Sequence, residues 1–212
     1  MRILSFLFLL LVTCGPAGAQ DFQSWNEVDL AATWRKVDLL VPLLARTDNS
    51  LPNPQLAATG LTADLPLGRH FILTGGYLFA DLPQKSLAVH VPLVAVTNAF
   101  RLGRTTLADR NRFEKLFNYP NAPVRYRNRF LVEEALGTSR RWHLFADDEV
   151  FFDLTAGAWS QNRLRAGGGV RLQRRLLLDV YYLRRNAGGS AEPVHVLGTN
   201  LRISLTRASQ GR

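Results

Sequence analysis

The chain contains very little cysteine and very little lysine. Its one cysteine, Cys14, lies near the first residue, so the remaining sequence has no disulfide framework and no thiolate metal site. Only three of the 26 basic residues are lysines, namely Lys36, Lys85 and Lys115; the others are arginines. After the first dozen residues, no apolar run approaches the ~18 residues of a membrane-spanning helix. These absences exclude a disulfide-stapled fold and a bundle of transmembrane helices.

The composition indicates one folded domain of ordinary size. The chain has 212 residues, of which 47% are hydrophobic and 10% aromatic, and this is too apolar for a disordered protein. The formal net charge is +9, which raises the question of nucleic-acid binding. However, the basic residues are spread along the chain and follow an export signal. We therefore expect no nucleic-acid partner.

Residues 1–19 have the three parts of a secretory signal peptide. Arg2 supplies the positive start, and the apolar stretch Ile3–Val12 follows it. Small residues at Ala17 and Ala19 predict cleavage before Gln20. A lipoprotein signal ending at Cys14 is the alternative, but Thr13 fits that motif poorly. The pattern therefore predicts export, with residues 20–205 as the folded domain and residues 206–212 as a polar C-terminal tail.

Period-2 alternation of apolar and polar residues dominates the chain after the signal and indicates β-strands. In the segment Phe22–Trp34, Val28 and Leu30 alternate with Glu27 and Asp29. Turn-forming residues separate about eleven such segments of roughly ten residues, a length that crosses a bilayer when tilted by ~45°. Because bacterial barrels usually have an even number of strands, we expect ten or twelve.

Alternation alone also fits a soluble barrel, but two features favour a membrane. The polar faces are strongly charged, and the apolar faces repeatedly carry aromatic residues near the strand ends, as an interfacial girdle does. The prediction is an all-β fold: a single antiparallel up-and-down transmembrane β-barrel with apolar side chains outward and a polar lumen. A soluble exported β-barrel that binds a small apolar ligand is the alternative.

The segment Arg101–Phe117 departs from this segregation of faces. Arg110, Arg112 and Glu114 share one face, whereas Asp109 and Lys115 lie on the other. A charge facing lipid at mid-bilayer is costly. This strand is therefore expected either to extend beyond the membrane or to contain a β-bulge.

Charged residues on the inward faces of the C-terminal half are the candidate lumen lining. Rings of arginine favour anions, so such a lining can form an anion-selective pore. The interpretation we favour is a ladder of arginine–carboxylate pairs that plugs a narrow barrel, whose interior has room only for side chains. A slow channel for small solutes is the variant left open. The candidates are Arg125, Arg127, Arg129, Glu133, Arg141, His143, Asp147, Glu149, Arg163, Arg165 and Arg171.

No motif for catalysis, a metal or a cofactor is recognised. Asp147 and Glu149 can share a face, but Asp148 points away, and no calcium-loop spacing is present. Ser160 and His143 are the nearest approach to a hydrolase pair, without a Gly-x-Ser-x-Gly motif. The histidines are expected to lie in the lumen, paired to neighbours, and Gly167–Gly169 is expected to mark curvature or close approach in a strand. We expect no enzyme; an outer-membrane lipid- or lipopolysaccharide-modifying enzyme is the alternative.

Several short pieces resemble the domain of unknown function 2490 family of exported bacterial proteins. The likeness covers nearly the whole chain after the signal and is most specific over residues 109–205. The matching pieces are Trp25-Asn26-Glu27, Arg110–Glu114, Arg125–Arg129, Asp148–Phe152, Gln161-Asn162-Arg163 and His195-Val196-Leu197. The chain departs from the usual barrel pattern because its last strand ends at Leu205 rather than at an aromatic residue.

The resemblance implies an outer-membrane β-barrel and brings no known activity. The expected surroundings are membrane lipid and lipopolysaccharide, and the outer-membrane assembly machinery is the expected partner during biogenesis. The expected location is the bacterial outer membrane, reached through a cleaved signal peptide.

Overall fold

The described residues of the computed structural model, 22–48, 54–188 and 192–206, form eleven β-strands and one short 3-10 turn. The predicted signal peptide, with its cleavage residues Ala17, Ala19 and Gln20, and residues 207–212 of the tail lie outside them. The strands are β1 Phe22–Trp34, β2 Val37–Thr47, β3 Pro54–Leu67, β4 Phe71–Leu82, β5 Leu87–Leu102, β6 Thr105–Lys115, β7 Val124–Leu136, β8 Trp142–Asp153, β9 Ala158–Gln173, β10 Leu176–Ala187 and β11 Val194–Ser204, and the turn η1 is Pro83–Lys85.

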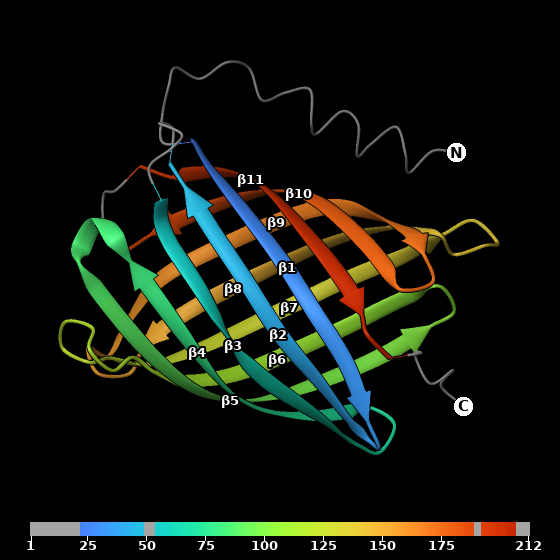
Figure 1. Ribbon diagram of the computed structural model, residues 1–212, viewed down its shortest axis with the longest axis horizontal. Coiled ribbons are helices and arrows are strands. Elements are labelled where there is room, and N and C mark those ends of the chain that lie inside the picture. The colour runs from blue at the N-terminus through green and yellow to red at the C-terminus, as the bar shows by residue number, and fades with distance from the viewer. Residues whose placement is uncertain (1–21, 49–53, 189–191, 207–212) are drawn as a thin grey trace.

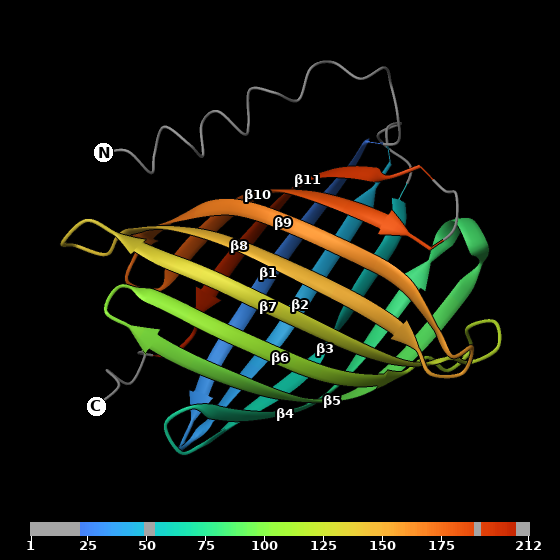
Figure 2. The ribbon, with the colours of Figure 1, turned by 180° about the vertical axis from the view of Figure 1, so that it is seen from behind.

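The strands close into a barrel, as Figures 1 and 2 show from opposite sides. Each strand pairs antiparallel with its sequence neighbours, but β1 and β11 close the ring by a parallel pairing that runs from Phe22↔His195 to Ala31↔Ser204. The all-β barrel prediction is confirmed. The expected even number of strands is wrong: an even count is needed only when every pair is antiparallel, and the parallel β1–β11 pair permits eleven strands among the described residues.

The pairing register places each side chain inside or outside the barrel. Asp29 and Glu149, on the inner face, are only 1% and 5% exposed, whereas Leu61 and Phe71, on the outer face, are each 50% exposed. The faces predicted for β1 agree with this, with Val28 outward and Asp29 inward. Segregation of faces is therefore real along most strands.

Strand β5 is apolar on both faces, which the sequence interpretation did not anticipate. Val89 and Val91 point inward and are buried with Leu116, whereas Val94 and Val96 on the same strand are exposed on the outside. The expectation that apolar side chains look outward is wrong for this inner wall. The lumen is thus polar along β6–β9 and apolar beside β4 and β5.

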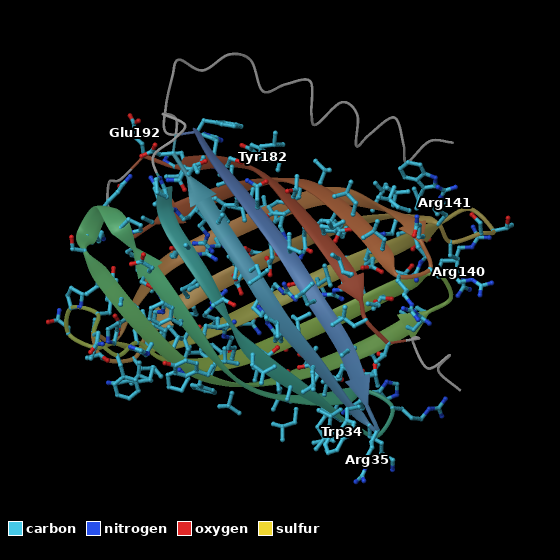
Figure 3. All side chains as sticks on the ribbon, viewed as in Figure 1. Trp34, Arg35, Arg140, Arg141, Tyr182 and Glu192 are labelled. Carbon is cyan, nitrogen blue, oxygen red and sulfur yellow. The ribbon has the colours of Figure 1, made fainter. Side chains whose placement is uncertain are left out.

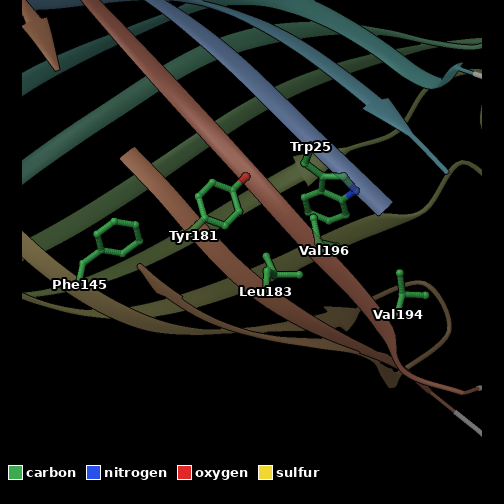
Figure 4. Close-up of a cluster of buried hydrophobic side chains, with 6 residues drawn as sticks. All are labelled: Trp25, Phe145, Tyr181, Leu183, Val194 and Val196. Atoms are coloured by element: carbon green, nitrogen blue, oxygen red, sulfur yellow. The ribbon is translucent and has the colours of Figure 1, made fainter. Parts of the chain in front are cut away.

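A second group of apolar side chains fills the lumen near the start of β1. Two glycines make room for it: a Cβ atom at Gly198 would lie 2.1 Å from Cζ of Tyr181, and one at Gly167 would lie 2.7 Å from Cβ of the same residue. Close approach at the predicted glycine run is therefore observed. The group, drawn in Figure 4, consists of Trp25, Phe145, Tyr181, Leu183, Val194 and Val196.

Strand β6 runs in continuous register against both β5 and β7, without a bulge in the described pairs. The bulge predicted as one explanation for Asp109 is therefore wrong. Asp109 instead points outward and accepts hydrogen bonds from the side-chain amides of Asn111 (2.8 Å) and Asn128 (2.6 Å). The hydroxyl of Tyr126 donates to Asn111 at 2.5 Å. We call these four residues the outer polar patch.

Within the described ranges, no helix is both long enough and apolar enough to cross a membrane.

Candidate functional site

The inner wall formed by β6–β9 carries the densest group of charges in the described structure. Register places Arg110, Arg129, Glu149 and Arg163 side by side on four adjacent strands. Because residues two apart share a face of a strand, the next inward positions bring further arginines alongside. We call this group the arginine wall; it comprises Arg110, Arg112, Glu114, Arg125, Arg127, Arg129, Asp147, Glu149, Arg163 and Arg165.

Glu149 is the centre of the arginine wall. Its carboxylate lies 3.0 Å from the guanidinium of Arg110, 2.9 Å from that of Arg127 and 3.6 Å from that of Arg163. These three partners come from β6, β7 and β9. A single buried carboxylate thus ties three strands to β8, through charge-assisted hydrogen bonds from Arg110 and Arg127 and an ion pair with Arg163.

Glu114 organises a second set of pairs on the same wall. Its carboxylate lies 2.8 Å from Arg112, 2.5 Å from Arg125 and 3.2 Å from Arg127. Arg127 therefore bridges Glu114 and Glu149, and the two sets form one network. Asp147 holds Arg165 separately at 2.6 Å.

In the lumen, several guanidinium groups lie over the faces of aromatic rings. The Cζ atoms of Arg127 and Arg163 lie 4.4 and 4.5 Å from the ring centre of Phe151. Arg163 also lies 5.1 Å from the ring centre of Trp25, and Arg46 lies 3.8 Å from it. These distances are those of cation–π contacts, which hold planar guanidinium groups in place.

Arg46 and Arg129 lie in the lumen without a paired carboxylate among the described residues. Arg46 and Arg129 form no ion pair with any described residue, and their Nε atoms are buried without an acceptor there. On β1, Asp29 pairs with Arg202 at 3.4 Å and forms no ion pair with Arg46 or Arg129. The wall therefore carries more positive than negative charge.

Ten of the eleven predicted lining residues lie on the inward-facing side of their strands by register: Arg125, Arg127, Arg129, Glu133, His143, Asp147, Glu149, Arg163, Arg165 and Arg171. Arg141 and Arg171 are exposed at the rim, where Nε of Arg141 donates to the carbonyl of Arg171 at 3.1 Å. Figure 3 shows Arg141 at that end of the barrel. His143 lies apart from the arginine wall, with Nε2 3.1 Å from Oδ1 of Asp179.

Some members of the wall and its surroundings were not among the predicted lining residues. The alternation already placed Arg110, Arg112 and Glu114 on one face, and this signal was sufficient to find them. Arg46 gave no such signal, because it follows the apolar run of β2 and reaches the lumen only near the end of that strand. Its contact with Trp25 depends on the β1–β2 register, which pairs the two residues.

The residues weighed for catalysis and metal binding are not brought together. His143 pairs with Gly169 on β9, roughly 30 Å along that strand from Ser160 at ~3.3 Å per residue. The described residues contain no group of three His, Cys, Asp or Glu side chains placed to hold a metal ion. Asp147 and Glu149 face inward, whereas Asp148 faces outward and accepts a hydrogen bond from Asn162.

The histidines differ from the expectation of a lumen location. His90 and His195 lie on the outer face, in contact with the hydroxyls of Tyr77 and Tyr182. Nδ1 of His70 lies 3.1 Å from the carbonyl oxygen of Ala99, and only His143 points inward among the four. Each does have a neighbouring partner, as predicted.

The fold and its interior define a closed β-barrel with an ion-paired, arginine-rich lumen. The chain belongs to the family described as protein of unknown function (DUF2490), whose model matches residues 22–194. A comparison with curated proteins finds no match.

Proposed function

We propose that this chain is an integral protein of the bacterial outer membrane, surrounded by lipid and lipopolysaccharide and inserted by the outer-membrane assembly machinery. The supporting observation is the apolar outer face. Large hydrophobic side chains are exposed around the ring, among them Leu43 on β2, Leu61 on β3 and Leu164 on β9. Soluble monomers rarely expose apolar patches beyond a few hundred Å². The strands have 11–16 residues, enough to cross a bilayer.

Aromatic side chains at both ends of the barrel support the same proposal. Trp34 and Trp142 are exposed at one end, and Phe22 and Trp159 are exposed at the other. Figure 3 shows Trp34 projecting from the lower end of β1. Aromatic girdles at the two membrane–water interfaces are typical of transmembrane barrels.

The lumen is proposed to be closed to bulk flow and to have no enzymatic role. Arg163 from β9 contacts both Trp25 from β1 and Phe151 from β8, so side chains from separated walls meet in the interior. Side chains alone fill the interior of barrels of about eight strands, and in this wider barrel long arginine and aromatic side chains reach across the interior. We expect the purified protein to give no steady current in a planar bilayer. A large ohmic current would contradict the closed lumen.

Replacing an outward-facing leucine by arginine tests the proposed membrane location directly. Leu61 is 50% exposed near the middle of β3. In a bilayer, Leu61→Arg should lower the free energy of unfolding by ~2–4 kcal/mol, the cost of an arginine facing lipid at mid-depth. Leu67→Arg at the strand end is the matched control and should cost ~0–1 kcal/mol. The measurement is denaturant unfolding of the protein refolded in phospholipid vesicles.

A soluble barrel would give the opposite result, because an exposed leucine in water can be replaced by arginine with little effect. Equal and small effects of the two variants, together with recovery of the wild-type protein in the soluble periplasmic fraction, would overturn the proposal. Recovery from the outer-membrane fraction only after detergent extraction supports it.

A further inference from the structure

Three guanidinium groups from three walls of the barrel converge on two aromatic rings in the lumen. Arg46 comes from β2, Arg127 from β7 and Arg163 from β9. Arg46 and Arg163 both lie against Trp25, and Arg163 and Arg127 both lie against Phe151. Arg163 therefore links the two rings, and like charges that repel one another are held close together.

The carboxylates of the described lumen do not balance this convergence. Arg127 and Arg163 share Glu149 with Arg110, and Glu114 already serves three arginines. Arg46 has no ion pair with a described residue. Glu27, which faces inward two positions from Trp25, adds only one further negative charge. The surplus positive charge therefore lies around the Trp25 ring.

Unbalanced positive charge in a confined lumen is strongly unfavourable, because an ion removed from water needs an opposite charge to compensate for its lost hydration. An anion between the guanidinium groups removes that cost. Guanidinium is planar and offers paired N–H donors that match the oxygens of a phosphoryl group, so several converging arginines favour a multivalent oxyanion over a halide. The cation–π contacts hold the guanidinium groups in place before any ligand binds, which lowers the entropic cost of ordering them on binding.

We propose that the lumen binds a phosphoryl oxyanion between Arg46, Arg127 and Arg163, beside Trp25. The site lies toward the end of the barrel where β1 begins, because Trp25 and Arg46 are paired near the start of β1 and the end of β2. The inference goes beyond the proposed function. It depends on the closed barrel and its interior but not on the membrane location.

Fluorescence of Trp25 provides a direct test. The full chain is purified in detergent with Trp34, Trp142 and Trp159 replaced by phenylalanine; these three are exposed on the outside and report the detergent. Inorganic phosphate should change the Trp25 emission saturably, whereas sodium chloride at equal ionic strength should not. Arg46→Gln and Arg163→Gln should each weaken phosphate binding about tenfold or more, since each removes a charge-assisted contact.

The matched control is Arg69→Gln, which removes the same charge from an exposed turn at the other end of the barrel and should leave affinity unchanged. Arg46→Lys keeps the charge but loses the planar fork, so it should bind phosphate more weakly than wild type and more tightly than Arg46→Gln. Heat-modifiable gel migration of each variant shows that it is folded, and phosphate should raise the unfolding temperature of wild type but not of Arg46→Gln.

Two further ligands identify the source of the phosphoryl group. Competition by glycerol 3-phosphate assigns a soluble phosphomonoester, and competition only by a short-chain phosphatidic acid assigns a lipid headgroup; either supports the site. Absence of any phosphate-dependent change in a folded protein, or an identical response in Arg46→Gln and wild type, would overturn it. Neither result bears on the Leu61→Arg experiment, so the two proposals fail separately.

Discussion

At the scale of single residues, the preference for arginine over lysine has a structural reason. Some guanidinium groups of the arginine wall serve two purposes at once: Arg127 pairs with two carboxylates while its Cζ lies over the ring of Phe151. Lysine offers a point charge and cannot reproduce this geometry. The three lysines are found in the β1–β2 turn, in η1 and at the end of β6. The preference for arginine over lysine in the composition therefore reflects how side chains fill the lumen.

The sequence predicted which charged residues face inward, but not which of them pair. Alternation fixes the face of Arg163 and Glu149, because period 2 is a property of each strand alone. Their contact depends on the stagger between neighbouring strands, which alternation does not encode. Arg46 and Trp25 were missed for the same reason, since only the β1–β2 register brings them together.

Replacing Glu149 tests the centre of the arginine wall. Glu149→Gln keeps the side-chain shape but leaves Arg110, Arg127 and Arg163 with fewer charge partners. Because breaking a buried ion pair from one side is strongly destabilising, the free energy of unfolding should fall by about 3–5 kcal/mol. Denaturant titration of the refolded barrel, followed by tryptophan fluorescence, measures this. Glu192→Gln at the exposed rim, labelled in Figure 3, is the control and should change stability by less than ~0.5 kcal/mol.

At the scale of elements, two strands show where a sequence pattern stops being sufficient. Strand β5 is apolar on both sides because its inner face packs on Leu116, which follows β6. Strand β6 places Asp109 outward without a bulge, because Asn111 and Asn128 complete its hydrogen bonds. Both outcomes depend on neighbours that the strand's own residues do not reveal.

The outer polar patch should behave as a unit when the barrel is refolded in phospholipid vesicles. Asp109→Leu removes the acceptor for the amides of Asn111 and Asn128, so it should destabilise the barrel by about 1–3 kcal/mol although it makes the outer face more apolar. Replacing all four residues together, with leucine at 109, 111 and 128 and phenylalanine at 126, removes donors and acceptors at once and should restore most of that loss.

Denaturant unfolding in phospholipid vesicles distinguishes these outcomes for the outer polar patch. A single Asp109→Leu variant that is as stable as the fourfold variant would show that the patch is not a coupled network. Asp148→Leu on β8 provides an independent comparison, because it removes the acceptor for the side-chain amide of Asn162 on β9. This variant should likewise destabilise the barrel.

At the scale of the whole molecule, closure explains both the fold and the one large error made from the sequence. The strand segments were recognised because each is a local pattern, and their count of about eleven was correct. The expectation of an even number of strands replaced this count, although an even number is required only when every strand pair is antiparallel. In lipid a sheet must leave no edge unpaired, and a parallel pair removes the edges as completely as an antiparallel one. The first and last strands therefore begin at the same end, and Phe22 and Ser204 lie at opposite ends of the barrel.

A designed disulfide tests this parallel closure. Val28 and Leu201 are directly paired across the β1–β11 seam, and both lie on the outer face. In a chain carrying Cys14→Ser, the pair Val28→Cys and Leu201→Cys should oxidise to an intramolecular disulfide, because paired strand residues fall within the Cα separation that the bond requires. Mass spectrometry of the tryptic fragments identifies the cross-link. The bond should also slow denaturant-induced unfolding, which reduction would reverse.

The out-of-register pair Val28→Cys and Leu197→Cys is the control for the seam. Leu197 lies opposite Ser24, which places it roughly 13 Å along the strand from the partner of Val28 at ~3.3 Å per residue. That separation is too long for a disulfide without movement of the backbone. Efficient oxidation of this control pair, or failure of the in-register pair in a folded barrel, would show that β1 does not close the ring in parallel with β11. An even-stranded barrel would then have to be reconsidered.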